Sequence, residues 1–232
     1  MDIHKPKPWH GVREFLKEYV IIVVGVLTAL GAEAVVQNLH EQRLSAEARN
    51  AVRAEINTNV TLVGRRLNSE PCIARRLDEI ATLLDRAEQG EAFAVPVVVA
   101  GPGNQRIATQ RWDAATAGGR TTLLTSDEQA DFARVYINLH HVTVLELEEI
   151  QTWAHLNALN GARHLSSGMI DAERLALSEA RMEDRDFRQA VAQAKFYAQR
   201  IGVKGDASLV LMPSQAPQNG PAICRPLSSA VP

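Results

Sequence analysis

Histidine and glutamate side chains gather between residues 140 and 164, where their types could support metal binding. The group consists of His140, His141, Glu146, Glu148, Glu149, His155 and His164. Two metal ligands on one helix usually stand three or four residues apart, whereas His141, Glu148 and His155 stand seven apart. Seven residues span about 10.5 Å of helix, too far for two of them to share one ion. We therefore expect a solvated polar stripe without metal; a metal or acid–base site completed by other helices is the alternative.

Motifs for nucleophilic or phosphate chemistry are missing from the sequence. It contains no Gly-x-Ser-x-Gly, no phosphate-binding loop, no His-Glu-x-x-His and no Cys-x-x-Cys. The formal net charge of −2 gives no reason to expect a nucleic-acid partner. We therefore expect a protein that is not an enzyme, with no catalytic residue and no cofactor.

The two cysteines, Cys72 and Cys224, are far apart in the chain and do not have the spacing of metal ligands. In an exported domain they would pair, because an oxidising compartment favours disulfides. The bond would tie the C-terminal tail to the start of the second predicted helix, and closing so long a loop gains roughly 4–5 kcal/mol in the chain-entropy model. Two free buried thiols are the alternative.

An apolar stretch near the N-terminus, "YVIIVVGVLTALGAEAVVQNL" at residues 19–39, predicts a membrane anchor. The uncharged part, Tyr19 to Ala32, covers 14 residues, or roughly 21 Å of helix, and cannot cross about 30 Å of hydrocarbon alone. The full 21 residues can. Lys17 is placed to reach the headgroups and Tyr19 suits the interface.

A cleaved secretion signal is the other interpretation of this stretch. A basic leader precedes the apolar run, and Ala32-Glu33-Ala34 fits a small-x-small cleavage pattern. Against it, the leader also carries Asp2, Glu14 and Glu18, and no proline or turn residue breaks the predicted helix before the cleavage position. We therefore expect a retained anchor that interacts with the lipid bilayer, with the N-terminus cytoplasmic and the following domain periplasmic, at the bacterial inner membrane.

Small residues mark one face of the anchor helix. At 100° per residue, Gly25, Ala29, Ala32 and Glu33 share one sector, and Gly25 and Ala29 form a small-xxx-small pair that lets membrane helices approach closely. Leu27 points the other way. An ionised acid at mid-membrane costs at least ~2.5 kcal/mol, so Glu33 is either paired or protonated at a helix contact, or solvated among the outer headgroups. We expect a membrane-protein partner or a homo-oligomer at this face.

Helical periodicity dominates the rest of the chain. Apolar residues recur at steps of three and four from Leu44 to Leu67, which predicts that the anchor continues into the soluble domain as one helix. Pro71, after Ser69 or Glu70 as cap, begins a second helix that Gly90 ends. Further helices are predicted around Trp112, from Ser126 onward, and in one or two segments after the break "SSGMIDAE". The predicted seams include Leu147 and Ile150 in the third long helix, and Leu175 and Met182 in the last.

The predicted architecture is therefore all-α, a transmembrane helix that continues into a bundle of four to five helices. Two apolar runs, "VPVVV" and "SLVLM" at 208–212, could add short strands. The domains predicted from these patterns are a cytoplasmic leader at 1–18, the transmembrane helix at 19–39, a periplasmic helical domain at 40–212 and an irregular, proline-rich tail at 213–232.

Two stretches together resemble a known group of proteins. They are "EYVIIVVGVLTALGAEAVVQNLHEQRLSAEARNAVRAEINTN" and "TQRWDAATAGGRTTLLTSDEQADFARVYINL". They are similar to uncharacterised single-pass bacterial membrane proteins, in which a Val/Ile/Gly/Leu anchor leads into a helical domain. The resemblance covers about residues 12–60 and 108–150 and implies an inner-membrane protein with an exported helical domain. That group has no assigned activity, so no residue role is carried over.

The expected function is that of a non-enzymatic interaction or accessory protein, whose periplasmic domain binds or stabilises another envelope component. A periplasmic sensor or ligand-binding module that acts through a partner is the first alternative, since about 18 cytoplasmic residues are too few for a signalling domain. An envelope enzyme is the second.

Overall fold

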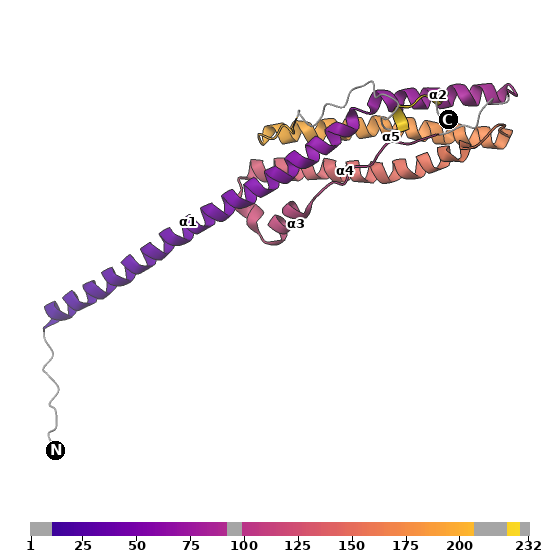
Figure 1. The fold of residues 1–232 in the computed structure, drawn as a ribbon. Coiled ribbons are helices and arrows are strands. Elements are labelled where there is room, and N and C mark those ends of the chain that lie inside the picture. The colour runs from indigo at the N-terminus through magenta and orange to yellow at the C-terminus, as the bar shows by residue number, and fades with distance from the viewer. Residues whose placement is uncertain (1–10, 92–98, 207–221, 228–232) are drawn as a thin grey trace, which may run out of the picture. The chain divides into compact units, whose positions relative to one another are not determined.

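A computed structural model describes residues 11–91, 99–206 and 222–227 of the chain. All secondary structure in these residues is helical (Figure 1). The elements are α1 (Val12–Leu67), α2 (Glu70–Glu88), α3 (Gln110–Ala117), α4 (Ser126–Leu156) and α5 (Ser167–Arg200), with short 3-10 turns η1 (Arg120–Leu123), η2 (Asn157–Leu159) and η4 (Ala222–Cys224). The all-α prediction is confirmed at this level. The two predicted strands lie largely or wholly outside the described residues.

The chain divides into two compact units, Met1–Glu47 and Ala48–Pro232. Helix α1 contributes to both, because it runs without interruption from Val12 to Leu67, as the lack of proline and the continuous apolar pattern predict. Its apolar residues before position 40 are exposed, whereas Val52, Ile56 and Val63 are buried in the second unit. The first part of α1 thus exposes its apolar side chains, whereas the second part is amphipathic and buries its apolar face.

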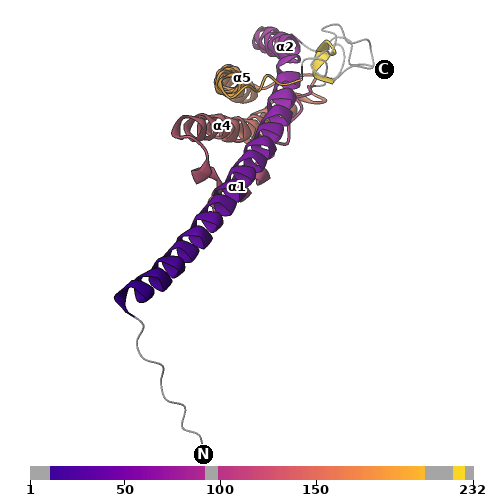
Figure 2. The ribbon, with the colours of Figure 1, turned by 90° about the vertical axis from the view of Figure 1, so that its left-hand side faces the viewer.

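Helix α5 lies between α2 and α4 in the second unit (Figure 2). Its arginines at 174, 181 and 188 stand seven residues apart and face acids of α2. The pairs are Arg174 with Asp85 (2.8 Å), Arg181 with Asp78 (2.8 Å) and Arg188 with Glu70 (3.3 Å). Since position numbers rise along α5 as they fall along α2, the two helices are antiparallel. Exposed pairs of this kind add little stability each, but together they select one register.

Two hydrophobic clusters fill this unit, one toward each end of α4 and α5. The first joins α1, the first half of α4 and the second half of α5, with Phe132, Leu139 and Phe187 fully buried. The second joins α2, the end of α4 and the first half of α5, around Ile80 and Leu156. The buried stripes repeat every three and four residues, which is why these segments form helices that pack along their length.

Helix ends follow the sequence signals with small shifts. Pro71 lies in the first turn of α2, as predicted, although the side chain of Ser69 makes no capping hydrogen bond. Gly90 adopts a φ of 79° directly after α2, a conformation that glycine favours. Helix α4 begins at Ser126, as predicted, and Thr125 is its N-cap. The predicted break at "SSGMIDAE" is instead the start of α5, where Ser166 accepts a bond from the Met169 amide.

Two of the predicted seams contain residues that the structure leaves exposed. Leu147 and Ile150 of α4 are 57% and 49% exposed, and Leu175 and Met182 of α5 are 62% and 53% exposed. Their helices bury a neighbouring stripe of residues instead. The prediction was wrong because it assigned these four residues to the buried stripe from their hydrophobicity. The buried stripe of each helix includes glutamates in their place.

Candidate functional site

The predicted membrane contact lies in the first unit, on α1. Gly25, Ala29, Ala32 and Glu33 are all exposed in this chain, and a Cβ added at Gly25 would meet no atom within 4 Å. The neighbouring apolar side chains are equally uncovered; Ile21 is 71% and Val36 67% exposed. By length and composition this helix could cross a membrane, and none of the apolar window is buried. The small-residue face is therefore available to a lipid or a partner helix.

Cys72 and Cys224 form a disulfide, with Cα atoms 4.7 Å apart. The bond joins the first turn of α2 to η4 across a sequence separation of 152 residues. Arginine side chains support the same junction: Arg75 donates to the Cys224 carbonyl, and the buried Arg76 donates to the Arg225 carbonyl. The predicted pairing is thus present in the structure, and polar contacts hold the C-terminal segment from the α2 side.

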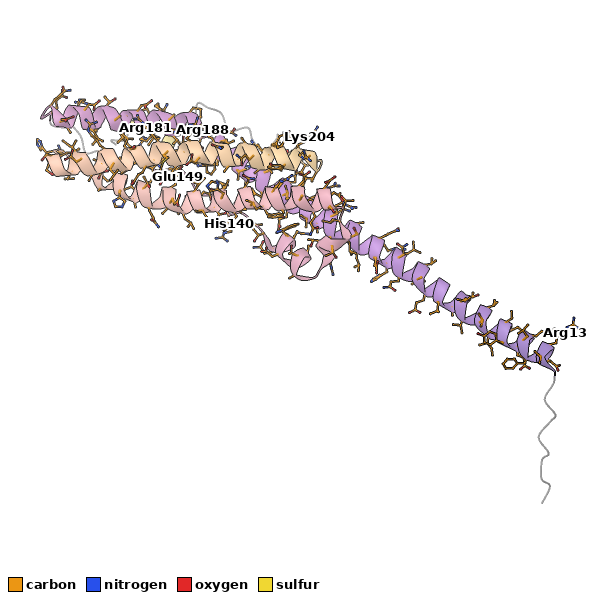
Figure 3. The ribbon with its side chains drawn as sticks, turned by 180° about the vertical axis from the view of Figure 1, so that it is seen from behind. Arg13, His140, Glu149, Arg181, Arg188 and Lys204 are labelled. Atoms are coloured by element: carbon orange, nitrogen blue, oxygen red, sulfur yellow. A yellow bond between two sulfur atoms is a disulfide. The ribbon has the colours of Figure 1, made fainter. Side chains whose placement is uncertain are left out.

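The histidine stripe on α4 is a surface feature. His140, His141, Glu148 and His155 are exposed, and Figure 3 shows His140 directed away from the helices that α4 packs against. His164 is exposed in the loop after η2. Among the residues that the structure describes, no three histidine, cysteine or acidic side chains are grouped as metal ligands. The predicted solvated stripe agrees with this exposure.

Two acids of the same predicted group behave differently, since Glu146 and Glu149 are each only 4% exposed. Sequence reasoning missed them by treating all the acids of this segment as one surface cluster. A signal was available: Leu139, Val142, Glu146, Glu149, Trp153 and Leu156 continue one three-four spacing, and all are buried. The two glutamates therefore occupy core positions of α4.

Buried charged residues from four helices meet between the two hydrophobic clusters. We call this set the buried polar layer; it consists of the buried Arg66, Glu149, Glu183 and Asp184, the partly buried Glu70 and the half-exposed Arg188. Along α4 and α5, Glu149, Glu183 and Asp184 fall between the segments that belong to the first cluster and those that belong to the second. The layer is the only place described here where α1, α2, α4 and α5 bring ionisable side chains together.

The centre of the layer is an ion pair between Arg66 and Glu149. Their Nη2 and Oε1 atoms are 2.5 Å apart, and the side chains are 1% and 5% exposed. The guanidinium also lies over the ring of Phe187, 4.7 Å from its centroid, a cation–π contact. Burial raises the pKa of Glu149 to about 7, while Arg66 opposes the rise. Figure 3 shows Glu149 on the side of α4 that faces α5.

A second group in the layer joins α2 to α5. Arg188 Nε lies 3.3 Å from Glu70 Oε1 and its Nη2 lies 3.4 Å from Asp184 Oδ2. Burial raises the pKa of Glu70 to about 7, and a hydrogen bond with Asp184 and the charge of Asp184 add to the rise; Arg188 and Arg66 oppose it. The remaining oxygen of Asp184, Oδ1, is buried without a hydrogen-bond partner. Figure 3 shows Arg188 and Arg181 along the α2 side of α5.

The edges of the layer are held by neutral groups. Thr152 Oγ1 donates to Glu183 Oε1 at 2.6 Å, and the amide of Gln105 donates to Glu146 Oε1 at 2.8 Å. Burial raises the pKa of both glutamates, and these hydrogen bonds oppose the rise. Burial therefore favours the protonated form of these two carboxyl groups, and the hydrogen bonds favour the ionised form.

A separate buried acid, Glu55 of α1, positions α3. Its carboxylate accepts hydrogen bonds from the amides of Arg111 (2.9 Å) and Trp112 (3.3 Å) and from the Tyr136 hydroxyl (2.5 Å). Trp112 stacks on Tyr136, with ring centroids 5.1 Å apart. Anionic oxygens are favourable at the N-terminus of a helix. Glu55 therefore acts as a structural cap rather than as a free base.

Comparisons of the chain with models of protein families, with curated proteins and with solved structures find no match.

Proposed function

We propose that this chain is a single-pass membrane protein of the bacterial inner membrane that works by contact with a partner, not by catalysis. The observation that carries the proposal is the uncovered apolar surface of α1 over residues 19–39, whose side chains remain exposed while the second unit buries its own core. A helix of this length and composition is stable in lipid, where water cannot reach its surface. A helix with so large an exposed apolar surface needs a membrane or a partner to cover it.

The orientation belongs to the same proposal. A leader of about 18 residues stays in the cytoplasm and the helical domain, from about residue 40, is periplasmic. The Cys72–Cys224 bond supports this side, because disulfides persist in oxidising compartments and are rare in the cytosol. Retention of the anchor, in preference to cleavage after Ala34, follows from the length of the full apolar segment.

The small-residue face of α1 is the proposed contact. Gly25 and Ala29 allow a second helix to approach closely, and Glu33 lies beside them on the same face. An acid within hydrocarbon needs a partner or a proton. The partner is either another membrane protein of the envelope or a second copy of this chain.

Purification of the full chain in a mild detergent tests the contact. We expect a stoichiometric membrane partner, or a homo-oligomer of defined mass, to co-purify with the unaltered protein. Gly25→Leu should reduce the recovered complex at least about tenfold, because a bulky side chain separates the helices by more than their packing tolerates. Glu33→Leu should reduce it by a similar factor, because it removes the carboxyl group that the partner helix would pair.

Ala34→Leu is the matched control, because this small residue lies on the opposite side of the helix from Gly25. It should leave the complex unchanged. Recovery of a monomer without a partner from native membranes would reject the proposed function. A reporter that is active only after export, fused at the C-terminus, tests the orientation separately.

A further inference from the structure

The buried polar layer contains more acids than bases. Four carboxyl groups, those of Glu70, Glu149, Glu183 and Asp184, face two guanidinium groups, those of Arg66 and Arg188. A carboxylate without a compensating charge is costly in a region from which water is excluded. Two acids that share a site cannot both ionise at their ordinary pKa values. The layer therefore needs protons to balance its charge.

The contact between Glu70 and Asp184 is the place where a proton is most needed. Arg188 approaches one oxygen of each residue, but both oxygens of Glu70 and Oδ1 of Asp184 are buried without a hydrogen-bond partner. Asp184 is 4% exposed, so the bulk solvent does not supply a donor. A proton carried by Glu70 can be donated to Asp184 and satisfies this oxygen.

Other groups around the pair have opposing effects. Arg66 of α1 favours the ionised form of Glu70, as does the positive N-terminal end of α2. The charges of Asp184 and Glu183 disfavour the ionised form of Glu149 on α4, so negative charges in the layer are mutually unfavourable. The single half-exposed Arg188 is the only cation that contacts both members of the pair in the described residues.

We propose that Glu70 and Asp184 hold one proton between them at neutral pH, and that its loss to solvent releases the first turns of α2 from α5. When the proton leaves, two carboxylates face each other across the helix contact and repel. Helix α2 can respond, because Asn68 and Ser69 form a turn between it and α1. The Cys72 disulfide keeps the released segment tethered to η4. This inference goes beyond the proposed function and does not depend on it.

The direction of the pH effect follows from linkage. Glu70 has a folded-state pKa of about 7, raised from 4.5. A raised carboxyl pKa means that the folded state binds the proton more tightly than the released state. The closed contact is thus most stable below about pH 4.5 and weakens as the pH rises through about 7. Above that range no further change is expected from this group.

Hydrogen–deuterium exchange of the full chain in detergent tests the proposal. The amides of residues 72–80 should lose protection between pH 5.5 and pH 8, by at least about tenfold after correction for the intrinsic exchange rate. The amides of residues 132–142 of α4, which lie in the first hydrophobic cluster, serve as the internal reference. In E70Q the amide donates permanently to Asp184, so protection of α2 should no longer depend on pH.

Two further variants complete the design. D184N places a neutral donor on the α5 side, so it should remove the pH dependence even if E70Q folds poorly. D78N removes the exposed pair with Arg181 on the same two helices and should retain the wild-type response. Equal protection of α2 at both pH values in the wild-type protein, relative to α4, would overturn the proposal. So would an undiminished pH response in E70Q or D184N.

Discussion

Arg66 shows how one buried charge depends on its single counterion. Its side chain is 1% exposed, forms one ion pair with Glu149 and covers the Phe187 ring. Two of its nitrogen atoms, Nε and Nη1, are buried without a hydrogen-bond partner. The ion pair therefore adds little net stability, because the cost of removing both charges from water offsets most of their attraction. We interpret it as a contact that selects how α1 and α4 pack.

Replacing Arg66 should be destabilising, because it leaves the carboxyl of Glu149 without its cation. We expect Arg66→Met to lower the free energy of unfolding by roughly 3 kcal/mol at pH 8. The loss should be smaller at pH 5.5, where Glu149, with a pKa of about 7 beside Arg66, becomes neutral. Urea unfolding followed by circular dichroism at the two pH values measures both effects.

The double variant R66M/E149L is the control for this prediction. It removes both charges and should recover much of the lost stability, because a hydrophobic pair can replace a buried ion pair at little cost. A double variant as unstable as R66M alone at pH 8 would mean that packing, not the unpaired carboxylate, causes the loss.

At the scale of the elements, the start of α4 shows how one side chain caps a helix that begins at the predicted residue, Ser126. Thr125 has extended backbone dihedrals and its hydroxyl accepts from the Glu128 amide at 3.3 Å. The position of the cap depends on where the buried stripe of α4 must begin. Phe132 and Val135 are both fully buried and set that register.

Thr125→Ala should therefore destabilise the protein by about 1 kcal/mol, the usual cost of a lost N-cap. Ser126→Ala, one position later, should change stability by only a few tenths of a kcal/mol, because its side chain is exposed and lies inside the helix. Thermal unfolding of the two variants side by side distinguishes them. A larger loss for Ser126→Ala would place the cap at Ser126, and equal losses would contradict the prediction.

At the scale of the whole chain, the disulfide fastens η4, near the C-terminus, to the first turn of α2. Besides the Cys72–Cys224 bond, burial of Ile223 in the second hydrophobic cluster holds η4. Hydrogen bonds from Arg75 and Arg76 to the Cys224 and Arg225 carbonyls, and from the Leu227 amide to Glu79, hold the same segment. A crosslink across 152 residues removes much freedom from the unfolded chain.

We expect the C72S/C224S variant to lose roughly 2–5 kcal/mol of unfolding free energy, the range observed for native disulfides. Reduction of the wild-type protein should give the same shift in the denaturation midpoint, which can be measured with and without a reductant. The reductant should not change the denaturation midpoint of the C72S/C224S variant. Full stability of the double serine variant would show that the remaining contacts hold η4 without the disulfide.

Much of the architecture can be predicted from the sequence because helices are specified locally. Periodicity and the absence of proline predict α1, Pro71 and Gly90 delimit α2, and Ser126 marks the start of α4. Periodicity also predicts helix in the segment of α5, although that helix begins within the predicted break. The pairing of Cys72 with Cys224 also follows, since only two cysteines are present. Each of these inferences uses residues that are neighbours in the sequence, or the only candidates of their kind.

What the sequence alone determined is therefore the helical class, the element order and the apolar segment at residues 19–39. Only the tertiary structure decided that Glu146 and Glu149 are buried while Leu147 and Ile150 are exposed, and that Arg66, Glu70 and Asp184 meet in one layer. The physical reason is that burial depends on which distant surfaces pack together. A carboxyl group can occupy a core position when a base from another helix, a hydroxyl or a proton compensates its charge, and those compensating groups lie up to 118 positions away, as between Glu70 and Arg188.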